Sequence, residues 1–325
     1  MRRSFSREWS VAGAIAILSL LLTISASGYF SGQNLADVFM TNVPVLLIAI
    51  GMTVVILTGQ IDISVGSMFA VCSVAAGVFA KMGLPMPIAG AAACVTGALL
   101  GAMNGGLVAY LRVPSIVVTL AAMVALRDGL RWATQGAWIE DLPHGFQWLG
   151  FSQSSYPAVT FFIACVLALA AVWALRDWAV GRAIYATGSN EEAARLSGIN
   201  TRLCIFSVFT LTGALTGFAA LLNSVRFNQI PSNAGLGLEM KVIAAVVVGG
   251  TAIAGGEGGI LGTVLGVILL GAIGPALTFL GINAYWEKAL QGAIILAAIA
   301  ADWARARFTL RALRKYASSP ASSRA

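Results

Sequence analysis

The chain has 325 residues, of which 58% are hydrophobic and 10% charged, with a mean hydropathy of +0.87. A soluble domain carries about 25% charged residues, so this chain lacks the polar residues that would cover a soluble core. The net charge of +7 gathers at the termini and between residues 176 and 202, and no basic patch is interleaved with stacking aromatics in a soluble segment, which argues against nucleic-acid binding. The composition predicts an all-α integral membrane protein.

Apolar stretches long enough to cross a bilayer recur along the chain, since a spanning helix needs about 20 residues. Seven are clear: 9–29, 40–59, 62–80, 86–111, 157–175, 204–223 and 259–283. Three are shorter and either cross or re-enter: 114–126, 242–254 and 289–301. We expect a polytopic bundle of about ten spans forming one domain over residues 1–304, followed by a basic tail over 305–325. The first stretch lacks a small-residue cleavage site, which predicts a retained anchor.

Basic residues predict the orientation, because cytoplasmic loops are enriched in lysine and arginine. With the N-terminus inside and ten spans, the cytoplasmic side receives the basic tail and Arg2, Arg3, Arg7, Arg112, Arg176, Arg182, Arg195 and Arg202. The outer side receives only Lys81, Arg127, Arg131, Arg226, Lys241 and Lys288. Both termini are therefore predicted to be cytoplasmic.

Several kinds of active site lack their usual residues in this sequence. There is no Gly-x-x-x-x-Gly-Lys-Ser/Thr phosphate loop, so ATP would have to be hydrolysed on another chain. The four cysteines (Cys72, Cys94, Cys165, Cys204) lie in apolar stretches without metal-ligand spacing, and we interpret them as packing residues. The lone His144 lies in the long loop 127–156 and is interpreted as a polar surface residue. We expect no catalytic residues, cofactor or metal.

Gly59, Asp62, Ser64 and Gly66 interrupt the apolar run from 40 to 80. Irregular backbone at membrane depth is tolerated only where it is buried in protein or lines a wet cavity, so Asp62 should point inward. One interpretation is a polar element beside a path through the bundle. The other, favoured by the predicted topology, is a tight cytoplasmic turn in which Asp62 is the helix N-cap. In either case Ser64 would help to cap the following helix.

A second interruption runs from Gly249 to Gly262 and includes Gly250, Gly256 and the charged Glu257. Glycines allow close helix approach and hinge-like backbone changes. Other glycines recur at intervals of about four residues and predict close helix packing: Gly97, Gly101, Gly105 and Gly106; Gly213 and Gly217; Gly262 and Gly266.

The cytoplasmic loop 181–200 contains signals for a short helix. Ser189 followed by Glu192 matches a capping box, and Glu191 and Glu192 complement the positive end of the helix dipole. Gly198 stands where a left-handed C-terminal cap is needed. The predicted two-turn helix is too short to be stable alone in water.

One face of this short helix is apolar. Ala193, Leu196 and Ile199 are spaced to lie together, which would let the helix dock in a groove of another protein. The other interpretation is an ordinary, well-capped loop between spans.

Three motifs resemble a known family. Glu192-Ala193-Ala194 with Gly198 resembles the Glu-Ala-Ala-x-x-x-Gly loop of bacterial ABC importer permeases. Residues 57–67 are similar to the Leu-Thr-Gly-Gly-Ile-Asp-Leu-Ser-Val-Gly-Ser signature of the ribose-type monosaccharide permeases, with Gln60 in place of a glycine. Residues 247–263 resemble the late glycine-rich segment of that subfamily. The resemblance spans roughly residues 40–300.

The resemblance implies a permease subunit of the bacterial inner membrane that is not itself an enzyme. It implies that the 189–199 helix couples to cytoplasmic ABC ATPase subunits, and that a periplasmic sugar-binding protein delivers a monosaccharide or small polyol. A second permease subunit would complete a homodimer or heterodimer. The alternatives are a passive channel and an ion-coupled secondary transporter, for which Asp62 and Glu257 are the candidate coupling residues.

Overall fold

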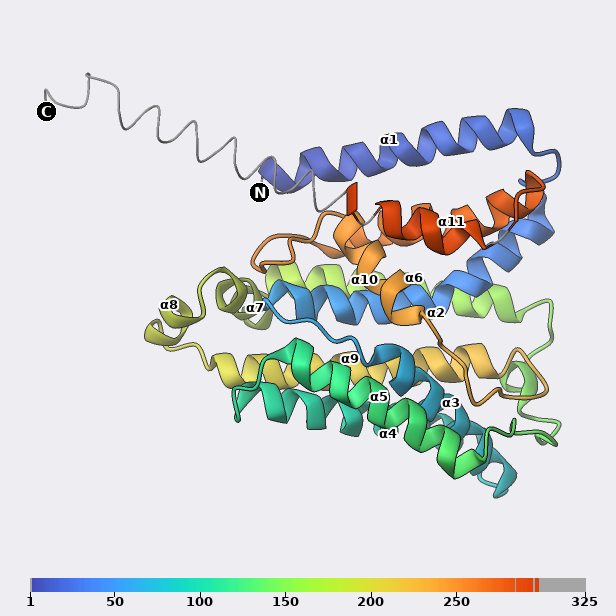
Figure 1. The fold of residues 1–325 in the computed structure, drawn as a ribbon, viewed down its shortest axis with the longest axis horizontal. Coiled ribbons are helices and arrows are strands. Elements are labelled where there is room, and N and C mark those ends of the chain that lie inside the picture. Colours follow the sequence, from blue (N-terminus) through green and yellow to red (C-terminus); the bar gives the residue numbers. More distant parts are fainter. Residues whose placement is uncertain (1, 284, 295, 298–325) are drawn as a thin grey trace, which may run out of the picture.

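The chain forms a helical bundle in a computed structural model that describes residues 2–283, 285–294 and 296–297. The long helices run along one another, and two short helices, α7 and α8, lie at one end together with the start of α1 (Figure 1). The elements are α1 (Arg2–Ser25), α2 (Gly32–Leu57), α3 (Val65–Lys81), α4 (Met86–Ala109), α5 (Ser115–Thr134), the 3₁₀ turn η1 (Gln147–Gly150), α6 (Tyr156–Asp177), α7 (Ala179–Ser189), α8 (Glu191–Leu196), α9 (Thr201–Ser224), α10 (Leu238–Val248) and α11 (Ile260–Phe279).

Six helices are long and apolar enough to cross a membrane: α1, α2, α4, α6, α9 and α11. The 17-residue α3 is a shorter apolar helix, and α10 has only 11 residues, about 16 Å at the usual rise per residue. The predicted span 289–301 lies partly outside the described residues, and the basic tail 305–325 lies wholly outside them.

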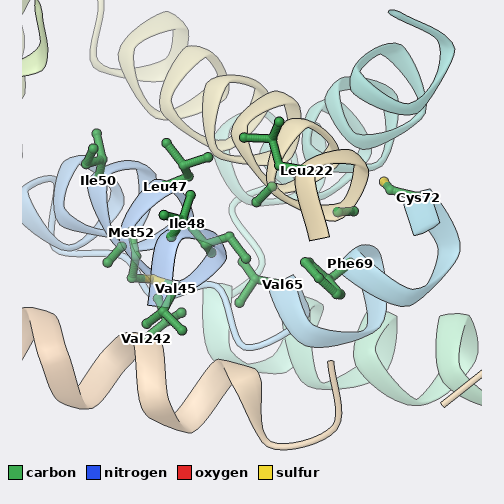
Figure 2. Packing of buried hydrophobic residues seen from close by; sticks show 14 of the residues in the cluster. Val45, Leu47, Ile48, Ile50, Met52, Val65, Phe69, Cys72, Leu222 and Val242 are labelled. Atoms are coloured by element: carbon green, nitrogen blue, oxygen red, sulfur yellow. The ribbon is translucent and has the colours of Figure 1, made fainter. Parts of the chain in front are cut away.

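Helix α2 forms the centre of the bundle. Its residues are apolar on every side rather than along one stripe, which is typical of a helix surrounded by protein. Figure 2 shows Val45, Leu47 and Met52 of α2 packed among α3, α9 and α10. Helix α1 packs mainly on α11 and leaves most of its surface open.

The most extensive helix contact joins α4 and α9. A Cβ atom at Gly97 or Gly101 would overlap the α9 backbone, and one at Gly217 would overlap the backbone of α4. The prediction of close packing at these glycines is confirmed. Gly106 is an exception, because the space beside it is open.

Two predicted boundaries are wrong. The span predicted to end at residue 126 continues as α5 to Thr134, since the Arg127 guanidinium is satisfied inside the protein by the carbonyl of Ala234 at 2.7 Å. A charge marks the end of a span only when protein groups do not pair it. The span predicted over 242–254 ends at Val248, where Gly249 meets the backbone of α11 at Gly262.

Two connections interrupt the long helices. We call residues 58–64, between α2 and α3, the first broken segment, and residues 249–259, between α10 and α11, the second broken segment. At the end of the bundle opposite α8, the loops after α5 and α9 pair through an isolated bridge between Ile139 and Ile230 (Figure 1). Neither broken segment takes part in this pairing of loops.

Candidate functional site

Helix α8 begins one residue later than the sequence predicts. Asn190 is its N-cap, with an extended backbone and a side-chain oxygen that accepts a hydrogen bond from the Ala193 amide at 3.0 Å. The predicted cap, Ser189, is the last residue of α7 and therefore cannot take the non-helical conformation that an N-cap requires. The Glu192 carboxylate pairs with Arg195 at 3.2 Å instead of completing a capping box.

The other signals of the short helix agree with the structure. Glu191 and Glu192 lie in the first turn, where their charges complement the helix dipole. Gly198 has a φ of +85° directly after the C-cap, and its amide donates to the Arg195 carbonyl. Both ends of α8 are therefore set by local side-chain and backbone chemistry.

The two faces of α8 differ sharply in exposure. Ala194 is 4% exposed and faces the bundle, where α8 contacts α7 and the start of α9. Leu196 is 81% exposed and Ala193 is also exposed. Ile199, just after the helix, is half-buried. Helix α8 is thus fixed to the protein by the side of Ala194 and presents the apolar Ala193 and Leu196 outward, beside the charged residues of the same helix.

The sequence predicts a loop over residues 181–188, but these residues are helical and belong to α7. It folds back after α6, and Gly181 permits this because a Cβ there would overlap the Leu175 carbonyl. Near its other end, a Cβ at Gly188 would overlap the Leu57 carbonyl at the end of α2 and would lie 2.7 Å from the Gly256 amide. Helix α7 therefore contacts the end of α2, next to the first broken segment, and the second broken segment itself.

The second broken segment also bonds to the end of α2, directly before the first broken segment. The Gly256 amide donates to the Leu57 carbonyl at 3.0 Å, and Gly256 has a φ of +75°. The Tyr185 hydroxyl of α7 donates to the Gly258 carbonyl at 2.8 Å. Burial raises the pKa of Tyr185 above its usual value, so the hydroxyl keeps the proton that it donates. The two glycine-rich motifs, far apart in the chain, thus meet at α7, the helix that directly precedes the third motif in α8.

Gln60, the departure from the family signature, leaves the first broken segment intact. The left-handed residue in this turn is Gly59, with a φ of +76°, whereas Gln60 has no positive φ. The Gln60 amide N–H donates to the Val55 carbonyl at 3.3 Å. The turn therefore needs glycine at 59 and not at 60.

Asp62 is fully buried, which confirms the expectation that it points inward. Its Oδ1 accepts hydrogen bonds from the Ser64 amide at 2.9 Å and the Ser64 hydroxyl at 2.6 Å. The Asn104 side-chain amide of α4 donates to the Ser64 hydroxyl oxygen at 2.9 Å. This chain of bonds joins the first broken segment to α4.

The predicted capping roles at this turn are wrong in detail. Ser64, not Asp62, is the N-cap residue of α3, yet its hydroxyl makes no capping bond: it donates to Asp62, and its oxygen accepts from the Asn104 side chain instead of a backbone amide. Asp62 instead forms an Asx turn with the residue two positions later. Gly66 follows in the first turn of α3, where a Cβ would overlap the Glu239 carboxylate at the start of α10.

In the second broken segment, glycines allow two stretches of backbone to lie in direct contact. Gly249 ends α10 against Gly262 of α11, and Gly250 has a φ of +97°. Glu257 is exposed, and its backbone carbonyl accepts from the Ala252 amide at 2.8 Å. The Glu257 carboxylate therefore lies on the surface and not among the buried groups of the junction.

Sequence reasoning missed two buried polar contacts. Arg127 and Lys241 were assigned to the outer side as loop charges, yet Arg127 donates to the Ala234 carbonyl, and Lys241 lies 3.7 Å from the Glu287 carboxylate with 19% exposure. Lys241 and Glu287 hold α10 to the helical residues 286–294. The available signal was a charge at the edge of an apolar stretch. Among the described residues, no His, Cys, Asp or Glu cluster fits a metal.

This arrangement, a helical membrane bundle whose outward-facing short helix is joined through α7 to the region of the two glycine-rich breaks, agrees with the family comparisons. The chain belongs to the family of branched-chain amino acid transport system permease components, which matches residues 34–299. It is a permease subunit of a ribose-type ABC importer and a multi-pass protein of the bacterial inner membrane. The ion-coupled alternative is thereby set aside.

The chain is similar to individual permeases over most of its length. It is 38% identical over 297 residues to the autoinducer 2 import system permease protein LsrC of Salmonella typhi, covering 91% of this chain and 86% of that protein. It is 36% identical to LsrC of Escherichia coli (strain K12 / DH10B), covering 91% and 87%. No solved structure matches the chain.

Proposed function

We propose that the chain is one of two permease subunits of an importer driven by separate ATPase subunits, which dock on α8. The observation that carries this proposal is the exposure of the two faces of α8. Leu196 is 81% exposed at the tip of the bundle, whereas Ala194 is 4% exposed and anchors the helix. A six-residue helix is unstable alone, so a held helix with an apolar outer face suits a groove on a partner protein.

Motion passes from α8 to the bundle through α7. A displacement of α8 would carry α7 against the Leu57 carbonyl and against Gly256, because Gly188 leaves no free space between them. Helices α2 and α11 flank these contacts and would tilt as rigid bodies. ATP-driven closure of the ATPase pair would in this way alternate access across the membrane.

The broken segments have a mechanical role in this proposal. The Asp62–Ser64–Asn104 bonds hold the start of α3 on α4, so the two helices move together. Gly59, Gly66, Gly249, Gly250 and Gly256 permit close backbone contact or left-handed turns. In this proposal these segments transmit movement from the junction to the long helices.

The proposed substrate is a small neutral polyol: a monosaccharide or a furanosyl compound of the autoinducer 2 class. Identities of 36–38% to autoinducer 2 permeases over 91% of the chain support this class. A soluble sugar-binding protein on the periplasmic side would deliver it. The second permease subunit is either a copy of this chain or a sister permease.

The proposed topology has about ten spans with both termini in the cytoplasm. The start of α1 and the α7–α8 pair lie at the same end of the bundle (Figure 1), and Arg182, Arg195 and Arg202 belong to that end. This charge distribution supports placing that end inside. The short α3 and α10 would then pair with neighbouring helices across the bilayer.

The test is uptake of labelled autoinducer 2 and ribose into vesicles that contain the permease, its cognate ATPase and the binding protein. We expect uptake only with all components and ATP. Uptake that persists without the ATPase and follows a proton or sodium gradient would refute the proposal. Omitting the binding protein serves as a control for passive leakage.

A further inference from the structure

A cleft of about 710 Å³ opens beside α8. Helix α8 contributes Glu191, Glu192 and Arg195 to one wall, and the turn between α4 and α5 contributes Arg112 to the other. The start of α9, with Arg202, closes the end, and Gln60 of the first broken segment also lines the space. The cleft therefore connects the candidate docking helix with a second part of the same end of the bundle.

The charges lining this cleft are not balanced within the protein. Glu192 pairs with Arg195, and Glu191 accepts a hydrogen bond from the Thr201 hydroxyl at 3.2 Å. The Arg112 and Arg202 side chains are exposed and form no ion pair or hydrogen bond with any other described residue. These two arginines, one in the α4–α5 turn and one in the first turn of α9, are thus left to bind an anionic group from outside.

The backbone at Arg112 is also unusual. Its φ is +57°, in the left-handed region that non-glycine residues rarely adopt. The Val113 amide donates to the Leu107 carbonyl at 3.3 Å, which closes the end of α4 around this residue. The strained turn fixes where the Arg112 side chain leaves the backbone, and such strain concentrates at functional positions.

We propose that this cleft receives an acidic segment of the ATPase subunit, whose carboxylates bind Arg112 and Arg202. This inference rests on the proposed docking at α8. Charge complementarity selects the partner, because planar guanidinium groups bind carboxylates in paired hydrogen bonds. The docking surface then has two parts, and the ATPase also contacts the α4–α5 turn and Gln60.

Through the cleft, the ATPase would contact a second part of the bundle in addition to α8. A segment seated between α8 and Arg112 would be fixed to α4 and α5 on one side and to α7 through α8 on the other. Closing of the ATPase pair would therefore move α8 relative to the α4–α5 turn instead of moving α8 alone.

The experiment measures the affinity of the purified permease in lipid nanodiscs for its cognate ATPase at several salt concentrations. Arg112→Glu and Arg202→Glu are compared with Arg176→Glu, which changes an exposed arginine at the end of α6 outside the cleft. We expect each cleft variant to bind at least fivefold more weakly, with a smaller salt dependence, and Arg176→Glu to stay within twofold of the wild type. Arg112→Gln serves as a milder variant if charge reversal lowers thermal stability.

The outcomes separate this inference from the proposed function. Unchanged affinity in both cleft variants, with loss of binding when Leu196→Glu alters α8, overturns the cleft while α8 docking stands. A wild-type permease that binds no ATPase overturns both. Nanodiscs with and without phosphatidylglycerol test an anionic lipid: cleft variants that lose lipid binding but keep ATPase affinity would also overturn the inference.

Discussion

Replacing Gly188 with alanine would place a methyl group where α7 meets the end of α2 and the second broken segment. The new Cβ would overlap the Leu57 carbonyl oxygen and lie 2.7 Å from the Gly256 nitrogen, closer than real Cβ contacts. Both neighbours are backbone atoms, so neither can rotate away as a flexible side chain would. Helix α7 must therefore move, or the bond from the Gly256 amide to the Leu57 carbonyl must break.

Two costs determine how much Gly188→Ala destabilises the contact of α7: steric overlap and the loss of a hydrogen bond. Inserting a methylene into a packed site costs about 1–3 kcal/mol. Losing one backbone hydrogen bond costs about 0.5–1.5 kcal/mol. Together they weaken the packing of α7 on the bundle by roughly 2–4 kcal/mol. A change of about 1.4 kcal/mol already corresponds to a tenfold change in a rate. We expect Gly188→Ala to lower ATP-driven transport at least tenfold.

The assay compares transport and ATPase affinity in the same vesicles. The outer face of α8 is untouched by Gly188→Ala, so ATPase binding should stay within threefold of the wild type. Gly106→Ala is the matched control, because Gly106 is also a helical glycine but has open space beside it. Wild-type transport in Gly188→Ala, at normal expression and thermal stability, would refute transmission through α7.

Three further predictions concern the same end of the bundle. Asn190→Ala should remove the cap of α8 at about 1 kcal/mol and weaken ATPase binding, while Ser189→Ala should not; equal effects would contradict the cap assignment. Asp62→Leu should lower thermal stability, since it leaves the Ser64 groups unpaired at about 1–3 kcal/mol, whereas Asp62→Asn keeps an acceptor and should be tolerated. Tyr185→Phe should lower transport by removing the bond to Gly258, measured against a Tyr110→Phe control.

The membrane class and most long helices follow from the sequence because lipid imposes a simple rule. A run of about 20 apolar residues identified α4, α6 and α9 within a few residues of their observed ends, whereas α2 begins at Gly32, well before the span predicted over 40–59. The glycine spacing on α4 and α9 also predicted their contact, since only glycine allows such backbone approach. These features depend on local composition.

The failures arose where tertiary contacts decide the local structure. Ser189 has the right residue type for an N-cap, but α7 continues through it and leaves the role to Asn190. Arg127 looked like the end of a span, but the carbonyl of Ala234, 107 residues away in the chain, binds its guanidinium. No local pattern contains that partner. The meeting of α7 with the end of α2 and with the second broken segment likewise depends on contacts between distant parts of the chain.

The most direct test of the account is photocrosslinking from α8. A photoreactive residue at position 196, where the leucine is 81% exposed, should form an adduct with the cognate ATPase, and adding nucleotide should change its yield. The same residue at Trp132, which is 79% exposed near the opposite end of the bundle, should form none. An ATPase adduct from position 132, or its absence from position 196 in a transport-competent complex, would contradict docking at α8.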